Sequence, residues 1–419
     1  GRQPVGEPDP PEVSNSAAEA ALPLLSLREG TPPLVTTAAE LNDVVRRLQT
    51  GTGPVALDAE RASGYRYSQR AYLLQLRRAG SGTALIDPIR CADLTPLAQT
   101  LGEAEWVLHA ATQDLPCLAE LGLRPSRLFD TELAGRLLGR DRVGLAALVA
   151  SELGMHLAKG HGAADWSQRP LADELLQYAA LDVELLLELR EILAQALNDQ
   201  QRWEWAEQEF AALCTFQPKG RGEEPWRRTS GIHRVRKPRA LAVVRSLWQT
   251  RDGLAQRLDQ APGRVLPDAA IVAAAQALPA SSDGLGALPE FSGRGQQRRL
   301  STWWAAVASA MALAAEDLPN SAPEHDGPPP PRQWADRHPA AAARLSAARS
   351  LVVDRSASLG IAAEVLISPD LVRRYCWEPP EVDQTETFLA SAGARPWQVE
   401  QVAPLLVAAQ AWPAVVTAQ

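Results

Sequence analysis

Four short apolar segments near the start of the chain are separated by turn residues and predict neighbouring strands of a sheet. They are residues 54–58 (PVALD), 72–76 (YLLQL), 83–87 (TALID) and 106–109 (WVLH). Beyond about residue 93 the apolar positions recur three and four apart, which is the spacing of amphipathic helices. Strands that give way to alternating strands and helices indicate an α/β domain with a helix-covered sheet.

The rest of the chain changes character several times. A long helix is predicted from Asp173 onward, with Asp173 as its N-cap. Residues 216–238 are rich in Arg and Lys and predict a basic connector. Two all-helical stretches follow, residues 239–318 and 335–419, joined by the Pro-rich linker 319–334. Each begins with a long amphipathic helix followed by a similar Val-Leu and Pro-Asp segment, so a repeat of two helical bundles is expected.

Length, charge and cysteines narrow the class of protein. A chain of 419 residues is too long for one core. The first 25 residues are polar and Pro-rich and predict a disordered leader, which makes residues 26–215 the first folded domain. The net charge of −8 argues against a generic nucleic-acid binder, although a carboxylate-rich site contributes negative charge. Four widely spaced cysteines and the lack of a membrane-length apolar run favour a soluble, cytoplasmic protein.

Five residues at the ends or on the faces of predicted elements are candidates for chemistry. Asp58 and Glu60 are two apart at the end of an apolar strand, so both carboxylates lie on one face. Asp114 begins a helix, and Tyr178 and Asp182 are four apart on one helix face. Singly, these are ordinary features: solvated strand-end acids, an acid favoured by the helix dipole, or a tyrosine at a helix edge. Crowded carboxylates, however, repel one another unless a cation lies between them, and a divalent metal commonly does so.

Taken together and in this order, the five residues resemble the DEDD exonucleases, in the tyrosine variant of the ribonuclease D family. The histidine variant would carry His where this chain has Gln177. Other segments resemble the three motifs of that family: residues 55–60 and 72–76 for the first, residues 107–110, 114–115, 128–131 and 137–139 for the second, and residues 165–171 and 178–182 for the third.

The resemblance implies a mechanism and a fold. The four carboxylates Asp58, Glu60, Asp114 and Asp182 would hold two divalent ions, Mg²⁺ or Mn²⁺, and Tyr178 would orient the attacking water. The fold would be a ribonuclease H-like mixed sheet flanked by helices, followed by two HRDC-like bundles. The bundles and the basic connector would hold RNA, or the bundles would serve as spacers or dimer contacts.

The residues around the predicted site suggest how a substrate would bind. The segment after Glu60 interleaves arginines and tyrosines, as a single-strand channel requires, and is equally typical of a surface turn. The substrate-binding candidates are Arg61, Tyr65, Arg66, Tyr67, Lys159, Arg227, Arg228 and Lys237. Three other polar residues are given structural roles: Asp130 as a helix cap, His109 as a hydrogen-bonded core histidine, and His161 as a solvated loop residue.

The sequence therefore predicts a metal-dependent 3′-5′ exoribonuclease. By the resemblance, it would act as a monomer on RNA with a free 3′ end, such as tRNA precursors, and release 5′-mononucleotides. Two alternatives stay open: the same chemistry on single-stranded DNA, and a catalytically idle RNA-binding scaffold. Retention of all five site residues argues against the scaffold.

Overall fold

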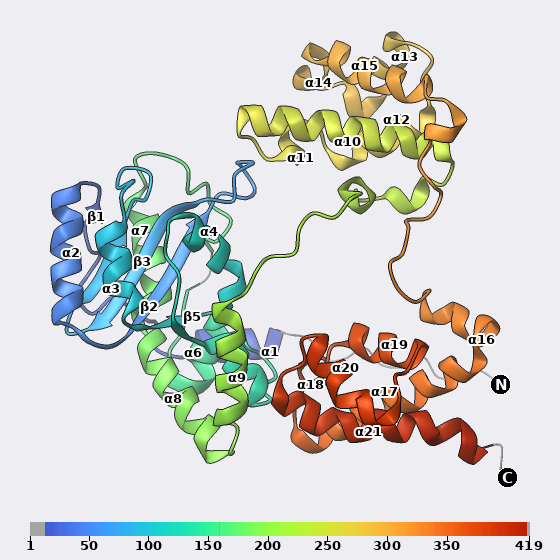
Figure 1. The fold of residues 1–419 in the computed structure, drawn as a ribbon. Coiled ribbons are helices and arrows are strands. Elements are labelled where there is room, and N and C mark those ends of the chain that lie inside the picture. The colour runs from blue at the N-terminus through green and yellow to red at the C-terminus, as the bar shows by residue number, and fades with distance from the viewer. Residues whose placement is uncertain (1–12, 159, 417–419) are drawn as a thin grey trace.

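The apolar segments near the start of the chain form the middle of a six-stranded mixed sheet. The computed structural model describes residues 13–158 and 160–416 (Figure 1). The strands lie in the order β1-β4-β3-β2-β5-β6. Their bounds are Leu34–Val35 (β1), Thr52–Arg61 (β2), Ala71–Ala79 (β3), Gly82–Ile86 (β4), Glu105–Leu108 (β5) and Arg127–Asp130 (β6). Because β2 pairs antiparallel with β3 and parallel with β5, the predicted α/β domain with a mixed sheet is confirmed.

The two edge strands, β1 and β6, are not predicted from the sequence. β1 spans only two residues, and β6 has only two apolar residues, Leu128 and Phe129, between the charged Arg127 and Asp130. β6 runs directly into helix α5 (Thr131–Leu137), and the Asp130 side chain accepts hydrogen bonds from the backbone N–H groups of Glu132 and Leu133. The expectation that Asp130 caps a helix is confirmed, and the strand before it forms only by pairing with β5.

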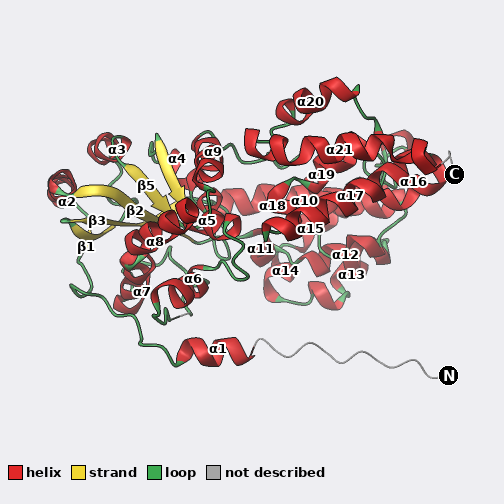
Figure 2. Cartoon of the chain, turned by 90° about the horizontal axis from the view of Figure 1, so that it is seen from below, coloured by secondary structure: helices red, strands yellow, loops and turns green. Residues whose placement is uncertain are grey.

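Helices cover both faces of the sheet, with α2 and α3 on one side and α7 and α8 on the other (Figure 2). The helices of this domain are α1 (Val13–Ala20), α2 (Ala38–Thr50), α3 (Thr95–Gly102), α4 (Leu115–Glu120), α5 (Thr131–Leu137), α6 (Leu145–Leu153), α7 (Asp173–Glu184), α8 (Leu186–Asp199) and α9 (Trp203–Cys214). A 3₁₀ turn, Ala111–Gln113, precedes α4.

The long helix predicted from Asp173 is two helices, α7 and α8. They are separated at Leu185, whose ψ of 9° lies outside the helical range. Asp173 is the first helical residue rather than the N-cap, because the extended residue Ala172 occupies the cap position. Asp173 and Glu174 instead place negative charge in the first turn, which the helix dipole favours.

Residues 13–25, predicted as part of the disordered leader, are ordered. Val13–Ala20 form α1, and the backbone N–H of Leu25 donates to the carbonyl of His156 at 2.8 Å. The prediction is wrong here because contacts with distant residues, invisible in local composition, fix the segment. Residues 1–12 of the predicted leader lie outside the described residues.

The first helical bundle follows a connector that is partly built into it. Its helices are α10 (Pro238–Leu258), α11 (Pro262–Val265), α12 (Asp268–Ala277), α13 (Ser282–Gly286), α14 (Arg294–Arg298) and α15 (Leu300–Met311). Within the predicted connector 216–238, Pro225–Arg228 and Ile232–Arg234 form 3₁₀ turns. Trp226 and Val235 are buried in the core of the bundle. The folded unit therefore begins about a dozen residues before the predicted boundary at residue 239.

The second helical bundle repeats the helix lengths of the first over three successive helices. Its helices are α16 (Trp334–Arg337), α17 (Pro339–Leu359), α18 (Ala363–Leu366), α19 (Pro369–Trp377), α20 (Thr385–Ser391) and α21 (Pro396–Val416). Helices α10, α11 and α12 of the first bundle have 21, 4 and 10 residues, and α17, α18 and α19 of the second have 21, 4 and 9. The sequence repeat thus corresponds to a structural one. None of the helices in the described part of the chain is long and apolar enough to cross a membrane.

The second bundle packs against the α/β domain through α9 and α21. The rings of Trp205 and Trp397 stack with centroids 4.5 Å apart, and Trp397 Nε1 donates to Glu209 at 2.9 Å. Buried side chains of the two units form one continuous hydrophobic core, whereas the first bundle has a core of its own.

Candidate active site

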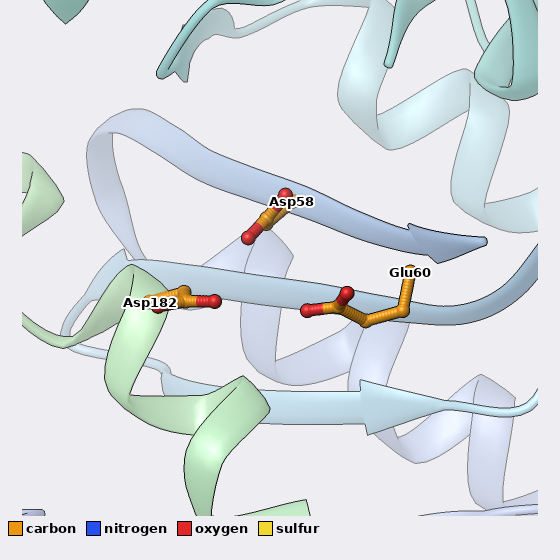
Figure 3. Close-up of side chains that lie close together, drawn as sticks. All are labelled: Asp58, Glu60 and Asp182. Atoms are coloured by element: carbon orange, nitrogen blue, oxygen red, sulfur yellow. The ribbon is translucent and has the colours of Figure 1, made fainter. Parts of the chain in front are cut away.

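Three carboxylates from two elements meet on one face of the sheet. Asp58 and Glu60 come from β2 and Asp182 from α7, and one oxygen of each lies within 4.8 Å of the others. Figure 3 shows the carboxylates of Glu60 and Asp182 directed toward each other, with Asp58 beside them. The period-two spacing of Asp58 and Glu60 thus puts both carboxylates on one face of the sheet, as predicted.

The fourth predicted carboxylate, Asp114, lies in the same cavity but outside that close group. It is buried at the start of α4 and lines the cavity together with the other three and Tyr178. The cavity has a volume of about 460 Å³. All five residues named from the sequence therefore line one cavity, although only three carboxylates lie within ligand distance of one another.

The polar residue Gln75 fixes Glu60 relative to α7. On β3, Gln75 is the register partner of Asp58 and is fully buried. Its Nε2 donates to Glu60 Oε1 at 2.9 Å and to the carbonyl of Ala179 at 3.3 Å. A single amide thereby joins the strand that carries two carboxylates to the helix that carries the third. The sequence reasoning missed this role, although Gln75 is the one polar residue in the predicted strand 72–76 whose neighbours are apolar.

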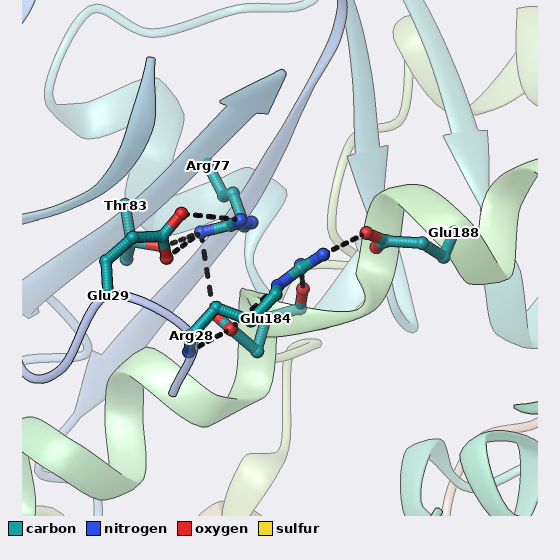
Figure 4. A network of polar contacts seen from close by, with 6 residues as sticks. All are labelled: Arg28, Glu29, Arg77, Thr83, Glu184 and Glu188. Atoms are coloured by element: carbon teal, nitrogen blue, oxygen red, sulfur yellow. Dashed lines mark hydrogen bonds and ion pairs between the residues drawn. The ribbon is translucent and has the colours of Figure 1, made fainter. Parts of the chain in front are cut away.

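A network of ion pairs holds the end of α7, two residues beyond Asp182 (Figure 4). Glu184 is 1% exposed and accepts hydrogen bonds from the backbone N–H of Arg28 at 2.8 Å and from its Nε at 3.0 Å. Arg77 on β3 approaches the same carboxylate at 3.5 Å. The other members of the network are Glu29, Thr83 and Glu188. Because a buried charge is stable only with partners, this network ties α7 firmly to the sheet.

The carboxylates disfavour one another's charged forms. Burial raises the pKa of Asp58 to about 6. Burial, with the charges of Asp58 and Asp182, raises the pKa of Glu60 to about 10. The pKa values of Asp114 and Asp182 are also raised well above normal, first by burial and then by Asp58. A divalent cation would relieve this repulsion, and a set of carboxylate oxygens suits hard ions such as Mg²⁺ or Mn²⁺. The acidic group therefore fits divalent metal binding.

Tyr178 projects from α7 one turn before Asp182. Burial, followed by the charges of Asp182 and Glu60, raises the pKa of Tyr178 to about 12. Its hydroxyl stays protonated at neutral pH and can donate one hydrogen bond while accepting another. The ring of His161 packs edge-on against it, with centroids 5.3 Å apart. His161 is exposed, as expected, but contacts the tyrosine of the site.

His109 lines the cavity from the end of β5 and is a hydrogen-bonded histidine, as predicted. Its Nδ1 lies 2.8 Å from Thr131 Oγ1. Burial, with the charge of Arg136, lowers the pKa of His109 to about 4, so the ring is neutral. Asp130 accepts from the backbone N–H groups of Ala110 and Ala111 at 3.0 and 2.9 Å, in keeping with a structural role.

The predicted substrate-binding residues separate into two groups. Arg61 and Tyr65 line the cavity, and Arg61 is its only lysine or arginine among the described residues. Arg66 Nε donates to Ser167 Oγ at 2.9 Å, and the hydroxyl of Tyr67 donates to Asp252 at 3.1 Å.

The basic candidates of the connector lie away from the cavity. Arg227 pairs with Glu224 at 2.9 Å and covers the ring of Trp226. Arg228 donates to a backbone carbonyl of the connector, and Lys237 occupies the N-cap position of α10. None of these three lines the catalytic cavity. Lys159 lies outside the described residues.

Comparison with protein families gives a match for each of the three units. Residues 32–198 match a family described as 3′-5′ exonuclease. Residues 240–307 match the HRDC domain, and residues 327–410 match a family described as the 3′ to 5′ exonuclease C-terminal domain. The fold and the acidic cavity thus define a 3′-5′ exonuclease, and the HRDC resemblance of the first bundle is confirmed.

Individual relatives give the particular family. Ribonuclease D of Gluconacetobacter diazotrophicus is 34% identical over 309 residues, which cover 71% of this chain and 77% of that protein. A solved structure of a protein from Bifidobacterium adolescentis has a TM-score of 0.86 and 37% identity, covering 93% of this chain and 99% of the other. Escherichia coli RNase D, described as an exoribonuclease involved in structured RNA processing, has a TM-score of 0.66 and 25% identity over 90% of this chain and 98% of its own. The chain belongs to the ribonuclease D family and is a 3′-5′ exoribonuclease.

Proposed function

We propose that the enzyme hydrolyses the terminal phosphodiester bond at RNA 3′ ends with two divalent ions and releases 5′-mononucleotides. The observation that carries the proposal is the convergence of five residues on one cavity: Asp58, Glu60, Asp114, Tyr178 and Asp182. Mg²⁺ or Mn²⁺ would be held by the carboxylates of this set. When bound, such ions lower the pKa of a water molecule and stabilise negative charge on a leaving oxygen.

The protein's own groups would orient the reactants. The hydroxyl of Tyr178 keeps its proton because its pKa is raised to about 12, so it positions the attacking water rather than accepting its proton. Gln75 holds the Glu60 carboxylate, and the Arg28–Glu184–Arg77 network holds the helix that carries Asp182. These supports keep the ligands in place before substrate arrives, which is what precise positioning of a reacting phosphate needs.

Arg61 is the residue best placed to bind a phosphate of the RNA backbone. It lines the cavity, and its side chain makes no hydrogen bond or ion pair with a described residue. A free guanidinium beside carboxylates that would bind metal can pair with a phosphate oxygen. Tyr65, on the same wall, offers a ring to the terminal nucleotide. Arg228, Lys237 and Arg227 would meet phosphates farther along the strand, and Lys159 remains a candidate for a phosphate contact.

We infer that the natural substrates are structured RNAs such as tRNA precursors, in the cytoplasm. The likeness to E. coli RNase D supports this substrate class. The cysteines at 91, 117, 214 and 376 are free thiols, which agrees with a reducing compartment.

The test is digestion of a 5′-labelled single-stranded RNA by the wild type and by Asp182→Asn, with Mn²⁺, Mg²⁺ or EDTA. We expect a ladder that shortens from the 3′ end with either metal, and no ladder with EDTA or with the variant. Glu174→Gln is the matched control, because Glu174 is an exposed acid on the same helix and should leave the ladder unchanged. RNA binding without cleavage under every metal would contradict the proposal and favour a scaffold. Faster cleavage of a matched DNA strand would reassign the substrate.

A further inference from the structure

The loop between β2 and β3, residues 62–70, has two sides with different surroundings. On its inner side, Ser63, Gly64 and Tyr65 line the catalytic cavity. On its outer side, the same loop meets the corner between α10 and α11 of the first helical bundle, toward which it extends in Figure 1. A wall of the active site is therefore in direct contact with a domain that carries none of the catalytic residues.

Arg264 of α11 makes the contact closest to the cavity. Its Nε donates to the carbonyl of Gly64 at 2.7 Å. Its guanidinium carbon lies 4.2 Å from the centroid of the Tyr65 ring. The backbone N–H of Ala261 donates to the carbonyl of Tyr65 at 3.1 Å. Both residues of the cavity wall are thus held by groups of the first bundle.

A second set of contacts holds the outer part of the loop. The backbone N–H of Ser68 donates to Asp259 Oδ1 at 3.0 Å, and the Tyr67 hydroxyl donates to Asp252 Oδ1 at 3.1 Å. Arg221 bonds both to that hydroxyl, at 3.0 Å, and to Asp252, at 2.7 Å. The Tyr67 ring packs against the core of the bundle. The loop is therefore anchored to the bundle by a backbone hydrogen bond, by packing of the Tyr67 ring and by hydrogen bonds to charged side chains.

The α/β domain holds the loop by apolar contacts, with Ala62 buried in its core and Tyr65 packed against that core, but it makes few polar contacts with the loop. Residues 62–70 have no regular secondary structure. Their side-chain hydrogen bond to another part of that domain is Arg66 to Ser167, at 2.9 Å. Ser63 bonds to Gln69 within the loop at 2.8 Å. Without the bundle, the carbonyls of Gly64 and Tyr65 would lose their hydrogen bonds to Arg264 and Ala261, and fixing this wall when substrate binds would cost conformational entropy.

We propose that Arg264 is a positioning residue for the exonuclease reaction. Through it the first helical bundle holds the Gly64–Tyr65 wall in the shape that grips the 3′-terminal nucleotide. The bundle then acts on the active site itself, in addition to any contact it makes with RNA. The proposal rests on the proposed function, because it assumes that the cavity receives the end of an RNA strand.

The test compares full-length wild type, Arg264→Ala and Arg264→Lys on a pentanucleotide RNA and on a long RNA. Loss of one hydrogen bond and one cation–π contact should raise KM for the pentanucleotide by about tenfold. Because the carboxylates are untouched, kcat should change by less than about twofold. Lysine keeps the charge and a donor, so Arg264→Lys should recover part of the affinity. Hydrogen exchange at the Ser68 and Ala261 amides should accelerate in Arg264→Ala.

Arg298→Ala is the matched control for this experiment. Arg298 is an exposed arginine on α14 of the same bundle, so this variant removes the same charge from the same domain. A pentanucleotide KM that is unchanged in Arg264→Ala, or raised equally in Arg298→Ala, would overturn the positioning role. An effect confined to the long RNA would also overturn it, because that pattern belongs to an RNA contact. Failure of the wild type to cleave the pentanucleotide would instead count against the proposed function.

Discussion

The two helical bundles contact the α/β domain in opposite ways. The second bundle shares a hydrophobic core with it, sealed by the stack of Trp205 on Trp397. The first bundle has a separate core and reaches the α/β domain through hydrogen bonds and a cation–π contact on the loop beside the cavity. The apolar joint is part of one continuous core and should dominate stability, whereas the polar joint touches the active site and should dominate substrate binding. We therefore expect the two bundles to serve different purposes, which depend on the part of the α/β domain that each contacts.

Trp397→Ala should produce the largest loss of stability. Trp397 is 2% exposed, stacks on Trp205 and donates to Glu209. Removing a buried tryptophan leaves a cavity and should lower the free energy of unfolding by about 4 kcal/mol, measured by chemical denaturation. Val382→Ala, at an exposed position of the same bundle, should change it little. Cleavage of a pentanucleotide per folded molecule should persist in Trp397→Ala, and its loss would contradict the division of roles.

A close approach of two glycines gives the next largest effect. A Cβ on Gly139 would lie 1.9 Å from the carbonyl oxygen of Gly360, and Gly139 has a φ of 75°. Gly139→Ala should therefore cost about 3 kcal/mol, since the two units must separate to admit the methyl group. Gly360→Ala is the control: its φ is 68°, but no atom lies within 4 Å of the added Cβ. Gly360→Ala should lower the free energy of unfolding by only about 1 kcal/mol. Equal losses for both variants would show that the contact between the two units adapts to the added methyl group.

In contrast to both joints, the acidic site should lower the stability of the metal-free protein, because its carboxylates are buried close together. The raised pKa values of Asp58, Glu60 and Asp182 mean that the folded state binds protons which the unfolded state has already released. The metal-free protein should therefore lose stability as pH rises above about 4, through the pKa of Asp58 at about 6 and up to that of Glu60 at about 10. Asp182→Asn in EDTA should raise stability at pH 7 by about 1 kcal/mol and flatten this pH dependence. Thermal melts at several pH values would measure both effects. A melting temperature lower than that of the wild type at pH 7 would contradict mutual repulsion among these carboxylates.

Tyr67→Phe should have the smallest effect and sharpens the comparison at the polar joint. The change removes a hydroxyl bonded to Asp252 and Arg221 but keeps the ring in the bundle core. Stability should fall by less than about 1 kcal/mol, and KM for a pentanucleotide should rise about threefold. A stability loss as large as that of Trp397→Ala would show that the polar joint is also structural.

Much of the site follows from short-range geometry in the sequence. The two-residue spacing of Asp58 and Glu60 and the four-residue spacing of Tyr178 and Asp182 place these side chains correctly. Edge strands β1 and β6 could not be predicted, because pairing with neighbours rather than their own pattern makes them strands. The surroundings of Tyr67 likewise depend on a contact that the local sequence does not reveal. The arginines and tyrosines around Tyr67 predict a substrate channel. In the structure the Tyr67 hydroxyl instead donates a hydrogen bond to Asp252, which lies 185 positions away in the sequence.

Calorimetric titration of the RNA-free protein with Mn²⁺ tests the central claim most directly. The account predicts saturable binding to the wild type and to Glu174→Gln, and strongly weakened binding to Asp182→Asn, because a ligand is lost. Equal binding by Asp182→Asn and the wild type would contradict the assignment of this carboxylate group as the metal site.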